Sequence, residues 1–93
     1  MTETVEREFS IQNELGLHAR PAGLFVSLAS RFTSEISVGR GDEWVDGRSV
    51  LSLLSLAASC GSQLRIRAEG PDAARAVEAL GQLLENPELS AGG

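Results

Sequence analysis

Polar and apolar residues alternate at the beginning of the chain. The two alternating sets are Val5, Arg7, Phe9 and Ile11 on one face, and Glu6, Glu8 and Ser10 on the other. A period of two predicts a half-buried β-strand. The same alternation returns in residues 63–69, where Leu64, Ile66 and Ala68 face inward and Arg65 and Arg67 face outward. This segment is predicted to be the most regular strand of the chain.

A spacing of three and four residues predicts a first helix from about Ala19 to Ser30 or Arg31. Its buried face is formed by Ala22, by Phe25 or Val26, and by Ala29. Pro21 is compatible with this helix because a proline in the first turn leaves no hydrogen bond unmade. His18 therefore lies at or beside the N-cap.

Two further helices are predicted by the same criteria. Ser49 is a suitable N-cap for a short helix through Ala57, and its buried residues are expected to be Leu53, Leu56 and Ala57. Gly70-Pro71-Asp72 precedes the last helix, with Pro71 in its first position. The apolar stripe of that helix is Ala73, Val77, Leu80 and Leu84, and Asn86-Pro87 ends it.

Two short strands are expected between the first and second helices. Residues 35–38 form one strand with Ile36 and Val38 inward, residues 39–42 form a glycine-rich turn, and residues 43–46 pair back. Val45 is the better candidate for the inward position of the second strand. Trp44 is compatible with either a core position or an exposed edge, and the sequence leaves both open.

The resulting order is βαββαβα. Because each strand has one apolar face, the expected fold is α+β, an open-faced β-sandwich with a four-stranded antiparallel sheet and three helices packed on one face. A chain of 93 residues forms one domain. We expect a single domain over residues 1–93 with a disordered tail at about 88–93.

Composition and charge exclude several classes of function. A net charge of −5 and the lack of a basic stripe argue against nucleic-acid binding. One histidine and one distant cysteine make no metal site, and no cofactor is expected. The polar start is unlike a signal peptide, and the longest apolar run, residues 50–58, is too short to cross a membrane. Cys60 is interpreted as a small buried thiol, and the protein as cytoplasmic.

The most informative stretch is Gly16-Leu17-His18-Ala19-Arg20-Pro21-Ala22, which contains the only histidine. A helix start offers backbone N–H groups and the positive end of the helix dipole, both of which suit an anion. An imidazole there, with the Arg20 guanidinium close by, indicates a site that holds phosphate on a histidine nitrogen. The alternative is that His18 is a surface or hydrogen-bonded residue with a structural role alone.

This stretch resembles the phosphorylation-site signature of HPr, the histidine-containing phosphocarrier of the bacterial phosphotransferase system. Two further segments resemble the same family: Phe32-Thr33-Ser34-Glu35-Ile36, and Arg48-Ser49-Val50-Leu51 followed by Leu53 and Ser55-Leu56. The spacing of these blocks and the chain length also fit. The resemblance implies the same open-faced sandwich, with the first and last strands adjacent.

The resemblance also implies an activity. His18 would accept a phosphoryl group from an enzyme I-type phosphotransferase charged by phosphoenolpyruvate, and would donate it to IIA-type domains in sugar uptake or its regulation. Such a protein is a monomeric carrier rather than a free-standing enzyme. The resemblance implies that Nδ1 accepts the phosphoryl group, although the sequence alone does not choose between the ring nitrogens. The amides of Ala19 and Arg20 and the Arg20 side chain would stabilise the phosphate.

By analogy with the family, the first two helices form the docking surface around the histidine. The expected partner-binding residues are Leu24, Ser27, Leu28, Arg48, Val50, Leu51, Ser52 and Leu54. Ser27, Ser30 and Ser52 stand where many relatives carry lysine or another polar residue, which bears on partner affinity. The alternative interpretation is that these leucines are scattered surface residues without a role.

Ser49 is the second candidate site. The resemblance implies regulatory phosphorylation by a dedicated HPr kinase/phosphorylase, whereas the residue itself predicts no more than a helix cap. A different function is also compatible with the sequence. The chain would then be a regulatory interaction module of a nitrogen-type or orphan phosphotransferase branch, controlled by phosphorylation at His18 or Ser49.

Overall fold

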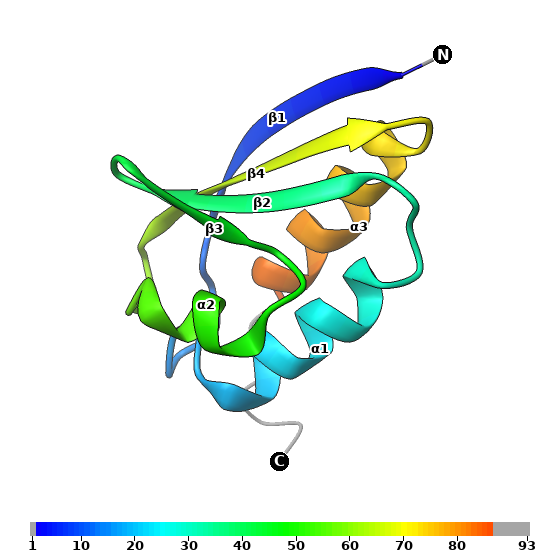
Figure 1. Ribbon diagram of the computed structural model, residues 1–93. Coiled ribbons are helices and arrows are strands. Elements are labelled where there is room, and N and C mark those ends of the chain that lie inside the picture. Colours follow the sequence, from blue (N-terminus) through cyan, green and yellow to red (C-terminus); the bar gives the residue numbers. More distant parts are fainter. Residues whose placement is uncertain (1, 87–93) are drawn as a thin grey trace.

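The computed structural model of the protein describes residues 2–86 and contains four strands and three helices in the order βαββαβα (Figure 1). The elements are β1 (Glu3–Ser10), α1 (Ala19–Ala29), β2 (Glu35–Arg40), β3 (Glu43–Asp46), α2 (Val50–Ser55), β4 (Gln63–Gly70) and α3 (Ala73–Leu84). This order confirms the prediction. The predicted tail at 88–93 lies outside the described residues. Within residues 2–86, the helices lack the length and apolar character that spanning a membrane requires.

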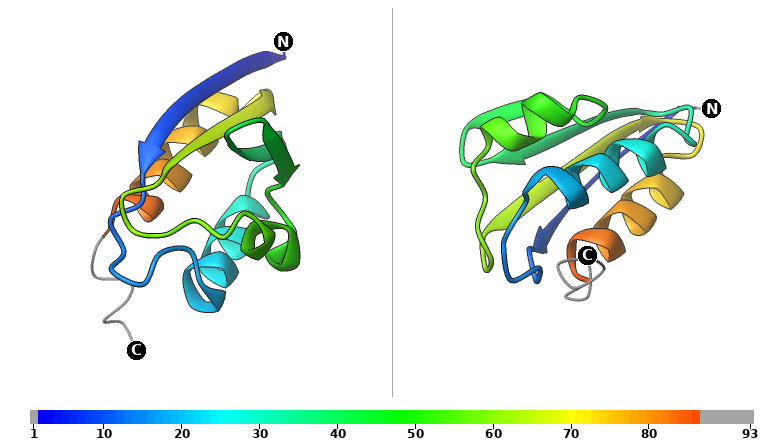
Figure 2. Two further views of the ribbon diagram at one scale, coloured as in Figure 1. Left: turned by 90° about the vertical axis from the view of Figure 1, so that its left-hand side faces the viewer. Right: turned by 90° about the horizontal axis from the view of Figure 1, so that it is seen from below.

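The strands form one antiparallel sheet in the order β1-β4-β2-β3. All three helices lie on the same side of it, and its other face is open (Figure 2). The first and last strands are neighbours, as the resemblance implied. Their register places Glu6 opposite Arg67 and Glu8 opposite Arg65 on the open face, where opposite charges in direct cross-strand positions are favourable. The open-faced sandwich is therefore confirmed.

The core lies between the helix layer and the inner face of the sheet. It contains the inward residues of β2 and β4, the buried faces of α1 and α3, and the first residues after β1: Ile36, Val38, Leu64, Ile66, Ala68, Ala22, Phe25, Ala29, Ala73, Val77, Leu80, Leu84 and Ile11. Gly81 allows α3 to approach β1 closely, because a Cβ atom there would meet the Phe9 ring at 2.1 Å. The glycine in the middle of α3 thus has a packing role.

The hairpin between β2 and β3 is tighter than predicted. β2 continues through Arg40, so the expected four-residue turn is reduced to Gly41 and Asp42. Gly39 pairs with Trp44 and Arg40 with Glu43, and the Trp44 ring lies over Gly39, where a Cβ atom would meet it at 2.9 Å. The Arg65 guanidinium covers the ring at 4.7 Å from its centre. Trp44 is therefore an exposed edge aromatic.

Val45, next to that tryptophan, is half-buried and packs against the core. This agrees with the expectation that Val45 is the inward residue of β3. On β1, Arg7 also lies on the helix side, where its guanidinium forms an ion pair with Glu78 of α3 at 2.8 Å. The position of β1 at the sheet edge allows this charged side chain to remain half-exposed.

The second helix and the thiol differ from the predictions. Leu53 and Leu56 are buried as expected, but α2 ends at Ser55 and Ala57 is exposed. Ala57 has a φ of +50°, and this left-handed residue turns the chain so that Ala58, rather than Ala57, enters the core. Cys60 follows on the surface and is exposed, so its interpretation as a buried thiol is wrong.

The start of α3 also differs from the prediction. The helix begins at Ala73, so Pro71 precedes it, and Asp72 is the N-cap. The Asp72 side chain does not cap its own helix. It accepts from the backbone amides of Thr33 (2.9 Å) and Ser34 (3.0 Å) and from the Ser34 hydroxyl (2.5 Å). These bonds, led by the Ser34 hydroxyl, lower the pKa of Asp72 from 3.8 to about 2.

Candidate functional site

A short loop brings His18 to the start of α1. The Asn13 side-chain oxygen accepts from the Leu15 amide at 3.2 Å, and the Asn13 carbonyl accepts from the Gly16 amide at 2.9 Å. Gly16 has a φ of +77°, which glycine adopts without strain. The Leu17 amide then donates to the Ala58 carbonyl at 2.9 Å. The loop before His18 is therefore seated on the segment that follows α2.

His18 is the N-cap residue of α1, as predicted. Its backbone is extended (φ −103°, ψ −172°), and its carbonyl accepts the Ala22 amide at 3.0 Å. Its side chain makes no capping hydrogen bond, and the first turn contains no acidic residue. Pro21 has no N–H to contribute. The positive end of the α1 dipole, with the amide of Ala19 at its tip, is therefore available to an external anion.

The two nitrogens of the His18 ring are in different environments. The residue is half-buried. In the part of the chain that the structure describes, only two covered side-chain polar atoms have no hydrogen-bond partner, namely Asn13 Nδ2 and His18 Nε2. His18 Nδ1 does not belong to this group. The ring thus turns Nε2 into the protein, and Nδ1 is the less covered of its two nitrogens.

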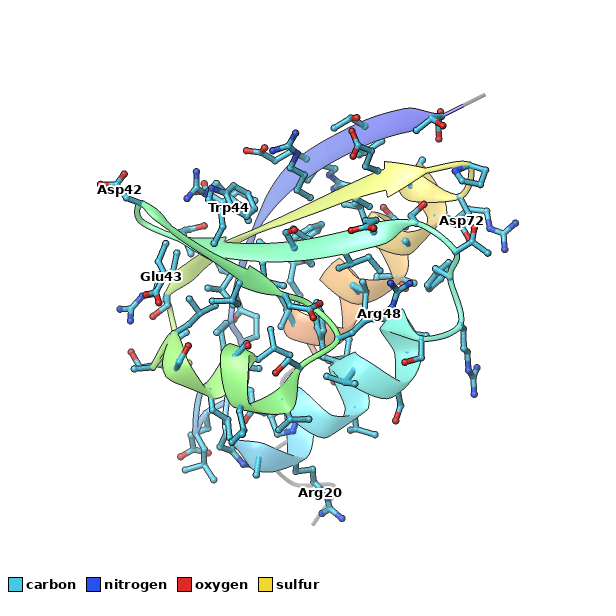
Figure 3. All side chains as sticks on the ribbon, viewed as in Figure 1. Arg20, Asp42, Glu43, Trp44, Arg48 and Asp72 are labelled. Carbon is cyan, nitrogen blue, oxygen red and sulfur yellow. The ribbon has the colours of Figure 1, made fainter. Side chains whose placement is uncertain are left out.

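Arg20 lies on the first turn of α1 and is exposed. Figure 3 shows its side chain projecting from the helix at the end where His18 lies. Three of the predicted elements of a phosphate site therefore lie at the same end of α1: the N-cap imidazole, the first-turn backbone and a guanidinium.

Ser49 is the N-cap of α2, which confirms the local prediction. Its hydroxyl accepts from the Ser52 amide at 3.2 Å, and its carbonyl accepts from the Leu53 amide at 3.0 Å. α2 lies beside α1 (Figure 1). Among the predicted partner residues of α2, Leu51 is 81% exposed, whereas Val50 and Leu54 are half-buried against the core. Leu51 is therefore the most prominent apolar side chain on this helix.

Arg48, one of the predicted partner residues, contacts the connection between α1 and β2. Its Nη2 donates to the carbonyls of Phe32 (2.7 Å) and Ser34 (2.8 Å) in the connection between α1 and β2. Figure 3 places Arg48 toward the C-terminal end of α1 and Arg20 at the opposite end. The structure therefore assigns Arg48 a bracing contact and does not bring it to His18.

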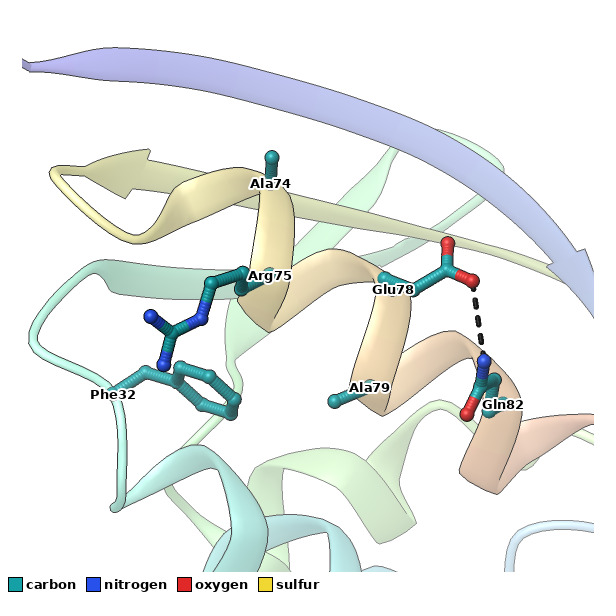
Figure 4. Close-up of a pocket in the computed structure, with 6 residues that line it drawn as sticks. All are labelled: Phe32, Ala74, Arg75, Glu78, Ala79 and Gln82. Atoms are coloured by element: carbon teal, nitrogen blue, oxygen red, sulfur yellow. Dashed lines mark hydrogen bonds between the residues drawn. The ribbon is translucent and has the colours of Figure 1, made fainter.

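The predicted partner residues of α1 lie on the side that faces α3. Leu24, Ser27 and Leu28 line a hollow of about 440 Å³ together with Arg31, Gln82, Leu83 and Asn86. Gln82 also lines a second hollow, of about 460 Å³, with Phe32, Ala74, Arg75, Glu78 and Ala79 (Figure 4). The three predicted partner residues of α1 therefore share one hollow with the C-terminal part of α3 and Asn86.

Leu15 was not among the predicted residues. Its side chain is 69% exposed in the loop that leads to His18. The available signal was an apolar residue between Glu14 and Gly16, in a segment that is otherwise turn-like. With Leu51, it adds exposed apolar surface on the two segments that flank the start of α1.

A comparison with protein families identifies the family to which this fold belongs. The family model described as "PTS HPr component phosphorylation site" matches residues 5–86. The chain belongs to the HPr family. An HPr phosphocarrier from Pseudomonas putida is 43% identical over 81 residues, which cover 86% of this chain and 90% of that protein.

Solved structures agree with this assignment. An HPr crystal structure from Bacillus anthracis matches with a TM-score of 0.84 and 37% identity, covering 87% of this chain and 96% of that one. An HPr dimer from Thermoanaerobacter tengcongensis matches with a TM-score of 0.69 and 43% identity, covering 83% of this chain and 88% of that one. As a member of the HPr family, the protein is a phosphocarrier of the phosphotransferase system and not a free-standing enzyme.

Proposed function

We propose that His18 is the residue on which this HPr protein carries the phosphoryl group, and that Nδ1 is the accepting atom. The observation that best supports this assignment is the environment of the ring. It belongs to an N-cap residue that makes no capping bond, and its Nε2 is covered while Nδ1 is not. A phosphoryl donor therefore meets one nucleophilic nitrogen at the positive end of a helix.

The transfer follows from this arrangement. The transfer requires the neutral tautomer that carries its proton on Nε2, because only then does Nδ1 have a free lone pair. The Nδ1–phosphorus bond forms as the bond between phosphorus and the donor breaks, and the reverse exchange delivers the group to the acceptor. Little covalent chemistry is required beyond alignment and charge stabilisation. The Ala19 amide, the α1 dipole and the Arg20 side chain supply that stabilisation.

The proposed partners are an enzyme I-type phosphotransferase, charged by phosphoenolpyruvate, as donor and IIA-type domains as acceptors in sugar uptake or its regulation. We further propose that the protein acts as a monomer in the cytoplasm. The exposed Leu15 and Leu51 lie on the segments that flank the start of α1, and a partner that covers them would exclude water from the transfer site. The proposed docking surface is centred on these two residues and on Ser52 of α2.

The test is to incubate the protein with an enzyme I-type phosphotransferase and phosphoenolpyruvate. Wild type and Ser49→Ala are expected to gain one acid-labile phosphate each, and His18→Ala none. Acid-labile phosphate on His18→Ala would overturn the assignment. The serine variant is the matched control, because it changes the N-cap of the neighbouring helix and leaves the imidazole in place.

We also propose that phosphorylation of Ser49 by an HPr kinase/phosphorylase lowers donor affinity. The supporting observation is that Ser49 lies at the start of α2, two residues before the exposed Leu51. A phosphate at a helix N-cap is electrostatically tolerated, but its charge would repel an acidic partner. For Ser49→Asp we expect the KM for the donor to rise about tenfold, while Ser49→Ala keeps the wild-type KM. An unchanged KM in Ser49→Asp would exclude this regulation.

A further inference from the structure

A guanidinium is bound to the carbonyl end of α2. Arg40, the last residue of β2, donates from Nη1 to the carbonyls of Leu56 (2.8 Å) and Ala57 (3.1 Å). Carbonyls at the end of a helix have no N–H partner within it, and a cation is favourable beside the negative end of the helix dipole. Arg40, on β2, therefore supplies the hydrogen-bond donor that the carbonyls at the end of α2 lack.

The turn that Arg40 contacts contains an unusual backbone. In the described part of the chain, Ala57 is the single residue other than glycine with a positive φ, at +50°. Glycine adopts this conformation readily, whereas the Cβ atom of alanine disfavours it. A left-handed alanine persists when the surrounding structure holds it in place. A backbone and a side-chain contact act on this residue: its amide donates to the Leu54 carbonyl at 3.0 Å, and its carbonyl accepts from the Arg40 guanidinium.

The same turn determines where the loop before His18 rests. Directly after Ala57, the Ala58 carbonyl accepts the Leu17 amide at 2.9 Å. Gly16 is packed so closely on this segment that a Cβ atom would meet the Ala58 oxygen at 2.5 Å and Ser59 Cα at 2.8 Å. A shift of Ala58 would therefore move Leu17, and with it the N-cap residue that follows.

We propose that Arg40 is a positioning residue for His18: by holding the left-handed turn at Ala57, it fixes the Ala58 carbonyl on which the loop before His18 rests. This inference deepens the proposed function and rests on it for the transfer measurement. Arg40 contacts neither the ring nor the incoming phosphate in this account. Its effect passes from the turn at Ala57 to the Ala58 carbonyl and then to the loop before His18. If the effect of removing Arg40 depends on which residue is at position 57, it is not a general effect on folding.

The dependence on Ala57 gives a rescue test. Glycine adopts a φ of about +50° without help, so Ala57→Gly is expected to make Arg40 dispensable. The variants are Arg40→Ala, Ala57→Gly, the double variant and, as a conservative change, Arg40→Lys. Arg67→Ala is the matched control for loss of charge, because Arg67 is exposed on the open face of the sheet.

The first measurement uses the unphosphorylated protein and needs no donor. NMR spectra of ¹⁵N-labelled protein report the Leu17 amide and the two His18 ring nitrogens. We expect these signals to shift in Arg40→Ala relative to wild type. The double variant should give the same signal positions as Ala57→Gly alone, and Arg67→Ala the same positions as wild type. Unchanged Leu17 and His18 signals in Arg40→Ala would overturn the proposal.

The second measurement is the rate of phosphoryl transfer to His18. At saturating donor we expect Arg40→Ala to be about threefold to tenfold slower than wild type because of misalignment. The KM should change less, because Leu15 and Leu51 remain, and Arg40→Lys should be intermediate. The double variant should come within about twofold of Ala57→Gly, as expected for coupled sites. Failure of this rescue would overturn the proposal.

The outcomes separate the two levels of inference. If wild type accepts no phosphate on His18, the proposed function fails, while the NMR comparison still decides the role of Arg40. If wild type is phosphorylated and Arg40→Ala resembles it in both measurements, the positioning role alone fails. Should Arg40→Ala not fold, the pairs of Arg40→Lys with wild type and of the double variant with Ala57→Gly decide the question.

Discussion

The helices α1 and α2 begin with the same backbone geometry but differ in whether a side chain caps the first turn. Each has an extended N-cap residue whose carbonyl accepts the amide four positions later. At α2 the Ser49 hydroxyl also accepts the Ser52 amide. At α1 the His18 ring makes no capping bond, and its Nε2 is covered without a partner in the described structure.

This difference shows that the start of α1 is less stabilised than the start of α2. α2 satisfies its own start, which is the usual solution for a short helix. At α1 the positive end has no side-chain cap. The missing cap and the covered, unpartnered ring nitrogen both lower the stability of the folded protein. Local departures from stable geometry are expected at functional sites. This comparison supports the proposal that the start of α1, rather than that of α2, is the primary phosphate site.

The most damaging change to this arrangement is expected at the loop that places His18. Gly16→Ala introduces a Cβ atom 2.5 Å from the Ala58 oxygen at a φ of +77°, and we expect a loss of about 3 kcal/mol in unfolding free energy. Gly61→Ala is the control, since Gly61 has a φ of +90° with no atom near its Cβ position. It should lose about 1 kcal/mol. Equal losses in chemical denaturation would show that the loop is not seated as described.

The next effect concerns charge at the open helix start. Arg20→Ala is expected to slow phosphoryl transfer to His18 by about 10- to 100-fold, because charged hydrogen bonds contribute about 1.5–3 kcal/mol. Arg31→Ala removes an equal charge beyond the other end of α1 and should stay within about twofold of wild type. Single-turnover rates provide the measurement. Equal slowing in both variants would indicate a general charge effect on docking.

A pair of cap substitutions tests the comparison between the two helices directly. Ser49→Ala should destabilise the protein by about 1 kcal/mol, because it removes the bond to the Ser52 amide. His18→Ser should instead stabilise it by about 1 kcal/mol, because serine can cap α1 and the covered Nε2 is removed. Thermal denaturation of both variants is the measurement. A destabilised His18→Ser would mean that the start of α1 is already satisfied.

The smallest effect is expected at the start of α3. The pKa of Asp72 is lowered from 3.8 to about 2 by the Ser34 hydroxyl and then by the Thr33 amide. Its contribution to stability is therefore complete above pH 3.8 and is lost as the pH falls through about 2. The stability gap between wild type and Asp72→Asn should be constant near neutral pH and close in this acidic window. A gap independent of pH would contradict the assigned bonds.

Much of the fold was predictable because it depends on local periodicity. The alternation in β4 and the spacing of Ala22, Phe25 and Ala29 in α1 specify which side is buried wherever one face meets a core. The N-cap positions of His18 and Ser49 follow from residue type and neighbouring pattern. These features were confirmed because sequence-local rules and tertiary packing favour the same conformation.

The errors concern residues whose positions depend on distant contacts. β2 extends through Arg40, where it pairs with Glu43 of β3, and α2 stops at Ser55, shortly before the chain turns at Ala57. The hydrogen bonds from Arg48 to the carbonyls after α1, which the sequence did not predict, are equally remote in sequence. Such contacts leave no periodic signal. The environments of the two His18 nitrogens required the structure for the same reason.

The most direct measurement is to determine which atom carries the phosphate. His18 is the only histidine, so protein labelled with ¹⁵N-histidine gives one pair of ring signals. After phosphorylation by an enzyme I-type donor, we predict a ³¹P–¹⁵N coupling at Nδ1 and none at Nε2. A coupling at Nε2, or phosphate on a serine with unchanged ring signals, would contradict the assignment of the open start of α1 as the phosphate site.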